Sequence, residues 1–469
     1  MAAWAFWFFG GYVNLSQIYV KFTDFELALR KPSRLTATLK DIEMWVMELA
    51  NKSILVVGGG ISGLTAAVEA AEVGYEVFLV EKSPYLGGRV AQLNQYFPKL
   101  CPPNCGLEIN FQRIKNNPKI RFITDSVVEN IAGEAGNFDV TVKTNPRYVN
   151  EKCTGCNKCV EACPAERDNA FNYGMNKTKA IYLPHQFAFP MRYVIDCDAC
   201  QGSECGKCAE ACPCGAIDLK MEAKNTTFNV GAVVWAAGWD PYDAKKISYY
   251  GFGQSENVIT NVIMERMASA NGPTEGKIVR PSDGKEINNI AFIQCAGSRD
   301  ENHLNCCSSV CCLASLKQAT YVREQYPDAK ISVYFIDVRA RGKFEDFYTK
   351  VQEETGLNLI KGKAGDIKED PQTKQLVVHA EDQVAGKITD EKYDLVVLAT
   401  GMAPTTRECK IPADVSYDQD GFVASDPQVP GIYAAGCVKR PMDVAACVQD
   451  ATAATLKAIQ STVRGQKNG

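Results

Sequence analysis

The apolar positions of this chain alternate between short uninterrupted runs and helical repeats. The run SILVV at 53–57 has no polar alternation, which is typical of a strand buried on both faces of a parallel sheet. A helical pattern, LTAAVEAAEVG, follows it and is closed by Gly74, and EVFLVEK then supplies a second strand. The pattern therefore predicts a βαβ unit over residues 53–82.

A glycine-rich turn joins the first predicted strand to the predicted helix. It contains Gly58, Gly60 and Gly63, and Glu81 ends the second strand eighteen residues after Gly63. Glycines at these positions let the backbone approach a pyrophosphate, whose charge the helix N-terminus favours. Glu81 would accept hydrogen bonds from an adenosine ribose. Strand, turn, helix and acid together predict a dinucleotide-binding Rossmann unit.

Two further segments favour FAD over NAD. Gly87-Gly88-Arg89 follows Glu81 where flavoproteins with two dinucleotide-binding domains carry a glycine turn, and GIYAAGC at 431–437 resembles their GxYAxGD segment, which contacts the ribityl chain. Cys437 replaces the usual Asp, and Asp443 a little downstream could substitute for it. The predicted flavin-binding residues are Gly58, Gly60, Ser62, Gly63, Glu81, Lys82, Gly88, Arg89, Val128, Gly238, Gly401, Gly436, Cys437 and Asp443.

Two cysteine runs between residues 153 and 214 carry ferredoxin spacing. The first is an unbroken C-x2-C-x2-C-x3-C-P run, and the second keeps C-x2-C-x3-C-P but has Gly202 where its first cysteine should be. In bacterial ferredoxins three thiolates of a run bind one [4Fe-4S] cluster and the fourth crosses to the other cluster. Cys200 or Cys197 must therefore supply the missing ligand.

This spacing predicts two clusters. The ligands of one would be Cys153, Cys156, Cys159 and Cys212, and those of the other Cys163, Cys205, Cys208 and either Cys200, which we favour, or Cys197. Structural zinc knuckles are the alternative, because C-x2-C also suits zinc. The three-residue gap followed by Pro in both runs favours iron–sulfur clusters.

A second unit begins near residue 288 and repeats the order of the first. NNIAFIQC and KISVYFIDVR read as strands, SLKQATYVREQY as a helix whose Lys317 and Arg323 form a solvated face, and DLVVLATG as the closing strand. The glycine loop that would bind NAD(P)H is missing, and Cys295 and the sequence CCSSVCC occupy its place.

Four thiols of the second unit could converge. Cys307 and Cys311 are expected on one helical face, Cys312 is adjacent, and Cys295 could close the site from the strand. From spacing alone, a third [4Fe-4S] cluster and a set of packed, inert thiols are both consistent with the pattern.

The cysteine-rich block interrupts the first sheet, so it is an insertion and not a terminal fusion. The predicted fold class is α/β, with two Rossmann units arranged as in thioredoxin reductase and an inserted α+β ferredoxin-like domain. The predicted domains are an N-terminal extension (1–50), the first part of the FAD domain (51–146), the insert (147–222), the FAD domain continued (223–287), the second Rossmann-like domain (288–394) and the C-terminal part of the FAD domain (395–469).

Composition narrows the class of protein. Twenty clustered cysteines in 469 residues argue for metal ligation in a reducing cytoplasm, and three histidines are too few to suggest haem. Lys plus Arg (51) nearly balances Asp plus Glu (55), so the charge does not indicate binding to nucleic acid.

The apolar stretch at 2–13 is too short to span a bilayer. We expect it to be an upstream extension, with the natural start at Met44 or Met47.

The sequence leaves three interpretations of Cys101 and Cys105, which are a redox pair, a cluster ligand and two unlinked thiols.

The second unit and the C-terminal segment resemble one known family. FIQCAGSRD, CCSSVCCLASLKQA, DVRARGKFEDFY and GIYAAGC…PMDVAACVQDATAA are similar to the A subunits of heterodisulfide reductases, over nearly the whole of 53–460. The resemblance implies a FAD-binding core with an inserted two-cluster domain. It also implies a third cluster held by Cys295, Cys307, Cys311 and Cys312.

The chain departs from that family in lacking its N-terminal cluster domain and C-terminal ferredoxin. In this it is similar to the flavin subunits of quinone-interacting membrane-bound oxidoreductases of sulfate reducers, and PYLGGRVAQLNQYFPKLCPPNCGLE and PHQFAFPMRYV carry that likeness. It implies a cytoplasmic electron-transfer oxidoreductase, attached to the membrane through partner subunits. Those partners are a haem-bearing membrane protein and a second protein with flavin and iron–sulfur clusters, and the complex links menaquinone to adenylylsulfate reductase.

Three other functions fit parts of the pattern. A heterodisulfide-reductase-type subunit could split an electron pair at FAD by bifurcation. An NAD(P)H-dependent reductase would need the glycine loop that the second unit lacks. A zinc-binding scaffold would contain no acid-labile sulfide. No nucleophile–base pair is evident, so we expect no catalytic residues of hydrolytic type.

Overall fold

The structure is a computed structural model that describes residues 51–424 and 429–464. The apolar stretch at 2–13 and the expected start at Met44 or Met47 lie outside the described residues. Within the described ranges, no helix combines the length and the apolar character that crossing a bilayer requires.

Five parallel strands form the sheet of the first half, in the order β22-β11-β1-β2-β3. The central strand β1 pairs Leu55 with Val233 on one side and with Phe78 on the other. The strands are β1 (Ser53–Val57), β2 (Glu76–Val80), β3 (Ile120–Ile123), β11 (Ala232–Trp235) and β22 (Ile432–Ala434).

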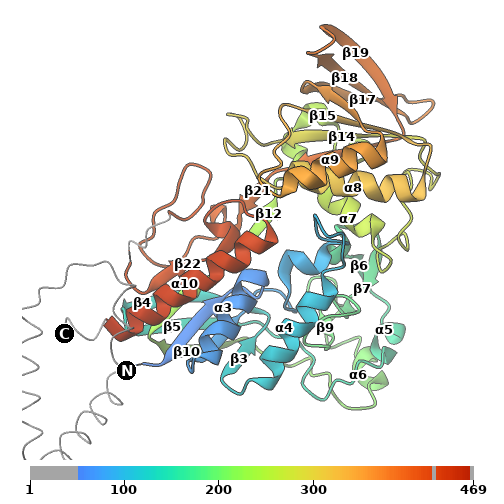
Figure 1. Ribbon diagram of the computed structural model, residues 1–469. Coiled ribbons are helices and arrows are strands. Elements are labelled where there is room, and N and C mark those ends of the chain that lie inside the picture. The colour runs from blue at the N-terminus through green and yellow to red at the C-terminus, as the bar shows by residue number, and fades with distance from the viewer. Residues whose placement is uncertain (1–50, 425–428, 465–469) are drawn as a thin grey trace, which may run out of the picture. The chain divides into compact units, whose positions relative to one another are not determined.

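Helices cover one face of this sheet and an antiparallel meander covers the other. Ile54 and Val56 pack against the helices, whereas Leu55 and Val57 pack against the meander, because successive strand residues point to opposite faces. Figure 1 shows α10 and α3 running beside each other along the sheet. The helices are α3 (Ile61–Glu72), α4 (Asn104–Asn116) and α10 (Val444–Arg464), and the meander is β4 (Ser126–Glu134), β5 (Asn137–Thr144) and β10 (Lys224–Val230).

The second half repeats this three-layer arrangement around a parallel sheet of order β13-β20-β14-β15-β16. Ile290 and Phe292 of β14 face the helices, and Ala291 and Ile293 face the meander. The strands are β13 (Val258–Thr260), β14 (Asn289–Ala296), β15 (Lys330–Phe335), β16 (Asn358–Lys361) and β20 (Leu395–Thr400). The helices are α7 (Asn261–Ala268), α8 (Cys311–Gln325) and α9 (Phe344–Thr355), and the meander is β17 (Ala364–Glu369), β18 (Leu376–Asp382) and β19 (Lys387–Tyr393).

The cysteine-rich segment lies between β5 and β10, and a short two-stranded sheet joins the halves. That sheet pairs β12 (Trp239–Pro241) with β21 (Met402–Pro404). The segment contains α5 (Lys158–Ala162), α6 (Lys207–Ala211), β6 (Glu166–Asp168), β7 (Lys177–Lys179), β8 (Ile181–Tyr182) and β9 (Val194–Ile195). The predicted fold class, with its α+β insertion, is confirmed.

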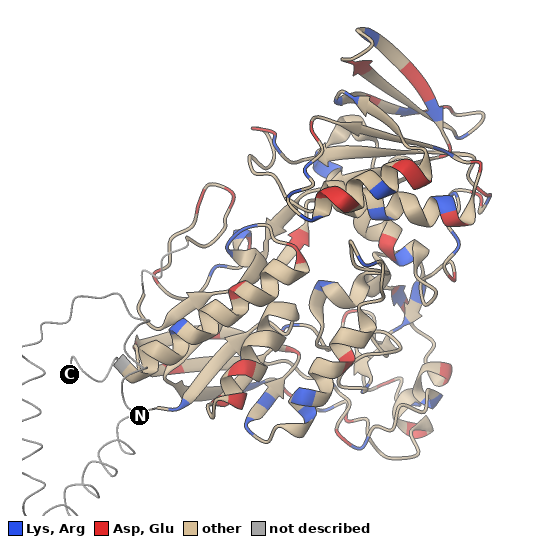
Figure 2. Cartoon of the chain, in the orientation of Figure 1, with Lys and Arg blue, Asp and Glu red and all other residues tan. Residues whose placement is uncertain are grey.

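Single 3-10 turns complete the described secondary structure. They are η1 (Gly88–Gln92), η2 (Ala170–Asn172), η3 (Ala244–Lys246), η4 (Ser248–Tyr250), η5 (Thr405–Arg407) and η6 (Gly436–Val438). Charged residues of both signs are interspersed along the elements, as Figure 2 shows, which agrees with the near balance of 51 basic and 55 acidic residues.

The insert is attached to the flavin half through the buried side chain of Arg147. Its guanidinium forms an ion pair with Asp125 at 2.9 Å and donates to the carbonyl oxygens of Pro84 at 2.7 Å and Tyr193 at 2.8 Å. A buried cation is tolerated only when its donors are satisfied. Arg147 therefore fixes the start of the insert to the loop after β2.

The prediction that Lys317 lies on a solvated face is wrong. Lys317 is 2% exposed, and its ammonium group contacts the carboxylate of buried Glu265 at 2.9 Å and the carbonyl oxygen of Gln95 at 2.7 Å. Gln318 also donates to Glu265 at 2.7 Å. Helical periodicity contained no sign of this pair, because Glu265 belongs to α7 and Gln95 to the first half of the chain.

Candidate flavin and iron–sulfur sites

The predicted pyrophosphate loop is a close backbone approach between β1 and α3. A Cβ atom at Gly63 would lie 1.7 Å from the carbonyl oxygen of Gly58, so no side chain fits there. A Cβ atom at Gly60 would meet only the Cα of Gly88, at 4.0 Å. No side chain caps the first turn of α3 and no acidic residue occupies it. The loop therefore leaves backbone N–H groups and open space for a phosphate group.

Glu81 lies buried at the end of β2, as the fingerprint predicts. One carboxylate oxygen accepts from the backbone N–H of Gly59 at 2.5 Å, and the other accepts from Ser83 at 2.6 Å. Burial raises the pKa of Glu81, although these two backbone donors oppose the shift. Two oxygens with further acceptor capacity fit a ribose, whose hydroxyl groups are donors.

Gly88 and Arg89 lie next to the glycine loop. A Cβ at Gly88 would be 2.9 Å from the Cα of Gly60, and Gly88 has a φ of +54°. Arg89 is paired with Asp240 and donates to the carbonyl oxygen of Trp239 at 3.2 Å and to the hydroxyl of Tyr173 at 3.1 Å. Arg89 thus connects the predicted flavin loop with β12 and with the insert.

The segment after β22 approaches the same loop. A Cβ at Gly436 would be 2.2 Å from the hydroxyl oxygen of Ser62, in the first turn of α3. Cys437 is buried, and its sulfur lies 3.5 Å from the sulfur of Cys447. No motif in the sequence pointed to this contact. Asp443 accepts from the N–H of Ala446 at 2.9 Å, so it caps the start of α10.

The other predicted flavin-binding residues are more dispersed. Gly238 follows β11, and its carbonyl oxygen accepts from Thr405. Gly401 directly follows β20 in the second half, where a Cβ would lie 2.1 Å from the hydroxyl oxygen of Ser298. Val128 lies in β4, and Lys82 is an exposed residue directly after Glu81.

The insert is built from two similar turns. α5 and α6 read KCVEA and KCAEA, and each follows a residue in the left-handed conformation, Asn157 (φ +68°) and Gly206 (φ +56°). Each helix buries its own cysteine, Cys159 or Cys208, and the two helices pack against each other. The insert is therefore an internal duplication with one cysteine run per copy.

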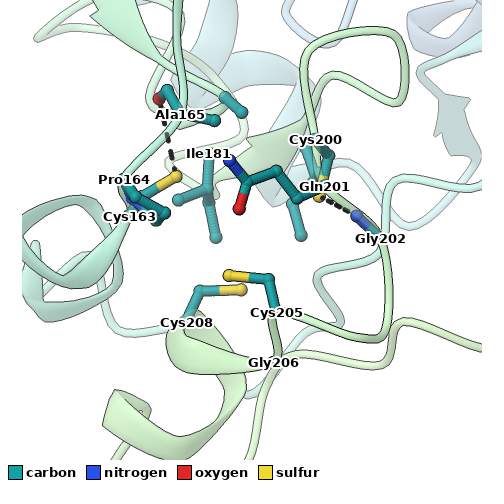
Figure 3. Close-up of a pocket in the computed structure, with 12 residues that line it drawn as sticks. Cys163, Pro164, Ala165, Ile181, Cys200, Gln201, Gly202, Cys205, Gly206 and Cys208 are labelled. Atoms are coloured by element: carbon teal, nitrogen blue, oxygen red, sulfur yellow. Dashed lines mark hydrogen bonds between the residues drawn. The ribbon is translucent and has the colours of Figure 1, made fainter.

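One pocket in the insert contains the thiols predicted for the second cluster. Cys163 from the first run and Cys200, Cys205 and Cys208 from the second run all line it. Figure 3 shows the sulfur atoms of Cys205 and Cys208 side by side, with the Cys163 sulfur across the pocket. The backbone N–H of Gly202 donates to Cys200 at 3.4 Å. Exposed Cys197 does not line the pocket, so the geometry favours Cys200.

Three of the four thiols predicted for the first cluster belong to the apolar core of the insert. Cys153 and Cys212 pack in it with buried Cys159, while Cys156 is exposed. Burial, with smaller contributions from Cys153 and Cys156, raises the pKa of Cys159 to about 12. The N–H of Ala216 donates to the Cys212 sulfur at 3.3 Å. Since iron binds thiolates, loading this site must displace protons.

Four thiols of the second half interact at the end of β14 and the start of α8. Burial raises the pKa of Cys311 well above its ordinary value, and repulsion from Cys312, Cys295 and Cys307 adds to the shift. The expectation that Cys307 and Cys311 share a helical face is wrong, because α8 begins at Cys311 and Cys307 lies in the preceding loop. Cys306 points elsewhere and interacts with Asp420.

Two arginines accompany these four thiols. Arg299 and Arg339 both pair with Asp337, at 2.6 and 3.2 Å. The positive charge of Arg299 interacts electrostatically with Cys295, and that of Arg339 with Cys307. The Cys312 sulfur lies 3.7 Å from the carbonyl oxygen of Asp337. This donor set, four sulfurs with adjacent cations, suits an anionic iron–sulfur cluster.

The spacing of the thiols bears on the zinc alternative. Among the described residues, no group of three or more His, Cys, Asp or Glu side chains is arranged to hold a single metal ion. Zinc would need four ligand atoms within about 2.3 Å of one centre. Each thiolate of a [4Fe-4S] cluster instead binds its own iron atom.

Cys101 and Cys105 are both exposed, and neither packs with a predicted ligand set. Cys105 lies in the first turn of α4, after the two prolines. No metal role is assigned to them.

Two family models and several related proteins are similar to this chain. A model described as FAD dependent oxidoreductase matches residues 53–133, and a 4Fe-4S binding domain model matches residues 146–166. The chain is 41% identical over 447 residues to one iron–sulfur A subunit of the CoB–CoM heterodisulfide reductase of Methanopyrus kandleri, covering 92% of this chain and 67% of that protein. It is 37% identical over 480 residues to the corresponding A subunit of Methanocaldococcus jannaschii, covering 97% and 72%.

Two further comparisons define the extent of the likeness. The A subunit of the H2:CoB-CoM heterodisulfide,ferredoxin reductase of Methanothermobacter thermautotrophicus is 38% identical over 425 residues, covering 88% of this chain and 64% of that protein. Among solved structures, thioredoxin reductase of T. acidophilum matches with a TM-score of 0.49 and 15% identity, covering 88% of this chain and 99% of that one.

Proposed function

Because this chain belongs to the heterodisulfide reductase A family of flavoproteins, we propose that it relays electrons between a cytoplasmic reductase and a quinone-linked membrane subunit. The chain is an oxidoreductase that binds FAD and [4Fe-4S] clusters. As partners we propose a haem-bearing membrane subunit linked to menaquinone, a second subunit with flavin and iron–sulfur clusters, and adenylylsulfate reductase or a similar redox partner. We also propose that these subunits attach the chain to the cytoplasmic side of the membrane.

The pocket of the insert is the observation that supports this proposal. Cys163 comes from one cysteine run and Cys205 and Cys208 from the other, and all three line the same pocket with Cys200. This crossing of one ligand between runs is the pattern of two-cluster ferredoxins. Two clusters close to each other, in a domain fixed to a flavin half by Arg147, suit a relay of single electrons.

The residues of the chain supply binding and orientation. When bound, FAD exchanges electrons in pairs or singly, and the clusters carry them one at a time. The loop of Gly58 and Gly63 admits the pyrophosphate, and Glu81 accepts from the ribose hydroxyls. Arg89 joins the flavin loop to Tyr173 of the insert and to Asp240. We propose Cys295, Cys307, Cys311 and Cys312 as ligands of a third cluster, where the second half lacks a glycine loop.

The choice of membrane-linked partners rests on PYLGGRVAQLNQYFPKLCPPNCGLE and PHQFAFPMRYV, which resemble the quinone-interacting branch. The alternative is a subunit that splits an electron pair at FAD. One relative favours it, because the name of the Methanothermobacter thermautotrophicus enzyme includes both a heterodisulfide and ferredoxin.

Cofactor analysis of anaerobically purified protein tests the ligand sets. We expect about 12 iron and 12 sulfide per chain in the wild type, and about 8 of each in Cys208→Ala and in Cys311→Ala. Cys197→Ala is the matched control for Cys208→Ala, because exposed Cys197 does not line the pocket. It should keep the wild-type content. Zinc without sulfide would refute the relay.

The proteins that co-purify distinguish the two candidate functions. A haem-bearing membrane subunit, with reduction of the bound clusters by a menaquinol analogue, would support the quinone-linked relay. Ferredoxin reduction that requires simultaneous reduction of a second acceptor would support bifurcation instead.

A further inference from the structure

Two buried cysteines outside every predicted cluster lie in contact with each other. The sulfur atoms of Cys437 and Cys447 are 3.5 Å apart, and each residue is 5% exposed. Cys437 follows Gly436 in η6, and Cys447 lies in the first turns of α10. None of the thiols predicted to bind iron belongs to their apolar cluster.

The surroundings of the pair are largely apolar. Met402 and Met442 share the same core cluster, and Ile61 and Trp239 pack against it. The Cys437 sulfur also lies 3.6 Å from the carbonyl oxygen of Met442. Asp443 and Asp450 interact electrostatically with Cys437, and Ser62 interacts with Cys447. Large soluble thiols and oxidants have little access to side chains buried to this extent.

A hydrogen bond joins the two sulfur atoms of the pair. The hydrogen bond between the sulfurs lowers the pKa of Cys437 and raises the pKa of Cys447, an effect that burial increases for Cys447. A thiolate in contact with a thiol is the arrangement from which a disulfide forms.

The position of the pair connects it to the flavin site. Gly436 approaches Ser62 in the first turn of α3 so closely that a Cβ would be 2.2 Å from the Ser62 hydroxyl. Ile61, which packs against the thiol cluster, begins the same helix. The pair is therefore adjacent to the loop that holds the dinucleotide.

We propose that Cys437 and Cys447 form a two-electron redox site, a dithiol in the reduced protein and a disulfide in the oxidised protein, with bound FAD as the electron partner. In the oxidising direction, the Cys437 thiolate and the Cys447 thiol lose two electrons and one proton as the sulfur–sulfur bond forms. FAD gains the two electrons and the proton and becomes FADH⁻. The charge is −1 on both sides, and no further reactant is needed.

Formation of the bond requires a limited movement. The sulfurs must approach from 3.5 Å to about 2.05 Å. The inference rests on FAD binding, which the proposed function also uses. It does not depend on the number of clusters or on the identity of the partner subunits.

Differential alkylation of the intact, cofactor-loaded protein tests the proposal. Samples are poised anaerobically, either oxidised with thionine or reduced with dithionite, then denatured in iodoacetamide and digested for mass spectrometry. We expect a peptide cross-linked between Cys437 and Cys447 in the oxidised sample, and two alkylated cysteines in the reduced one. Both cysteines alkylated in the oxidised sample would overturn the proposal.

An electron count supplies a second readout. Cys447→Ala should bind FAD and iron like the wild type, but it should take up about two electrons fewer in a stoichiometric reductive titration. Cys409→Ser is the matched control, because Cys409 is exposed and lies outside the pair. An unchanged electron count in Cys447→Ala would contradict the proposal, whereas loss of FAD or iron from the wild type would contradict the proposed function instead.

Discussion

The two cysteine-rich regions hold their thiols in different ways. In the insert, the ligand candidates lie on helices of five residues and on turns, and Cys156 is exposed. In the second half, Cys295 and Cys311 are buried, and Cys311 begins a helix of fifteen residues inside a three-layer αβ unit. The insert needs its thiols to complete a small core, whereas the second half would retain a core of its own without them.

The charges near the thiols differ as well. Backbone N–H groups of Gly202 and Ala216 approach sulfurs in the insert. In the second half, the cations Arg299 and Arg339 interact electrostatically with Cys295 and Cys307. Cations and hydrogen bonds at the sulfurs raise the reduction potential of a cluster. We therefore expect the two regions to differ in reduction potential, and a cluster at the second-half site to have the higher value.

The largest expected effect comes from removing the buried ammonium group of Lys317, which joins α8 to Glu265 of α7. Lys317→Met leaves Glu265 buried without its partner and should destabilise the protein by about 3–5 kcal/mol. Thermal melting of the anaerobic protein, followed through the cluster absorbance, measures the loss.

Two further variants separate the ion pair from other effects at α8. Lys317→Met with Glu265→Gln should recover much of the stability, because no unpaired charge remains. Lys350→Met removes an exposed ion pair with Glu354 on α9 and should cost at most about 0.5 kcal/mol. Equal melting of the single and double Lys317 variants would show that the charge is not the cause.

A smaller effect is expected from the two arginines. Replacing either Arg299 or Arg339 by Gln should lower the midpoint potential of the cluster proposed for the second half by about 60 mV, equivalent to about 1.4 kcal/mol. The insert clusters should keep their potentials. Spectroscopically monitored redox titration measures both.

Charge-retaining and distant variants control for packing. Arg339→Lys should keep most of the potential, since the positive charge remains. Arg341→Gln, an exposed residue on the same loop, should change nothing. A shift of the insert clusters equal to that of the second-half cluster would contradict the proposed division.

The smallest effect concerns acid sensitivity of the insert. His185 stacks on Phe171 at 4.6 Å, and burial together with Arg266 lowers the pKa of His185 to about 4. The depressed pKa means that the unfolded chain binds the proton first. Stability is therefore complete above about pH 6.5 and falls as the pH decreases toward about 4.

The size of this loss is measurable by thermal melting. Between about pH 7 and about pH 5.5 the wild type should lose about 1 kcal/mol that His185→Phe does not lose. Phe keeps the aromatic contact and removes the titrating nitrogen. Parallel losses in both proteins would place the acid sensitivity elsewhere.

The sequence alone determined the repeated βαβ order, the glycine fingerprint with Glu81, the insertion and both cysteine runs. These features are local, because strand and helix periods, turn glycines and ligand spacings are expressed within a few consecutive residues. The same locality explains the errors: helical periodicity assigned Lys317 to solvent and placed Cys307 on a helix that begins at Cys311.

Only the tertiary structure decided which distant groups meet. It brought Cys200, and not Cys197, to the pocket shared with Cys163, placed Glu265 against Lys317, and set Cys447 beside Cys437. Each contact joins separate elements, and its distance depends on how sheets and helices pack. Spacing along a chain does not contain that information.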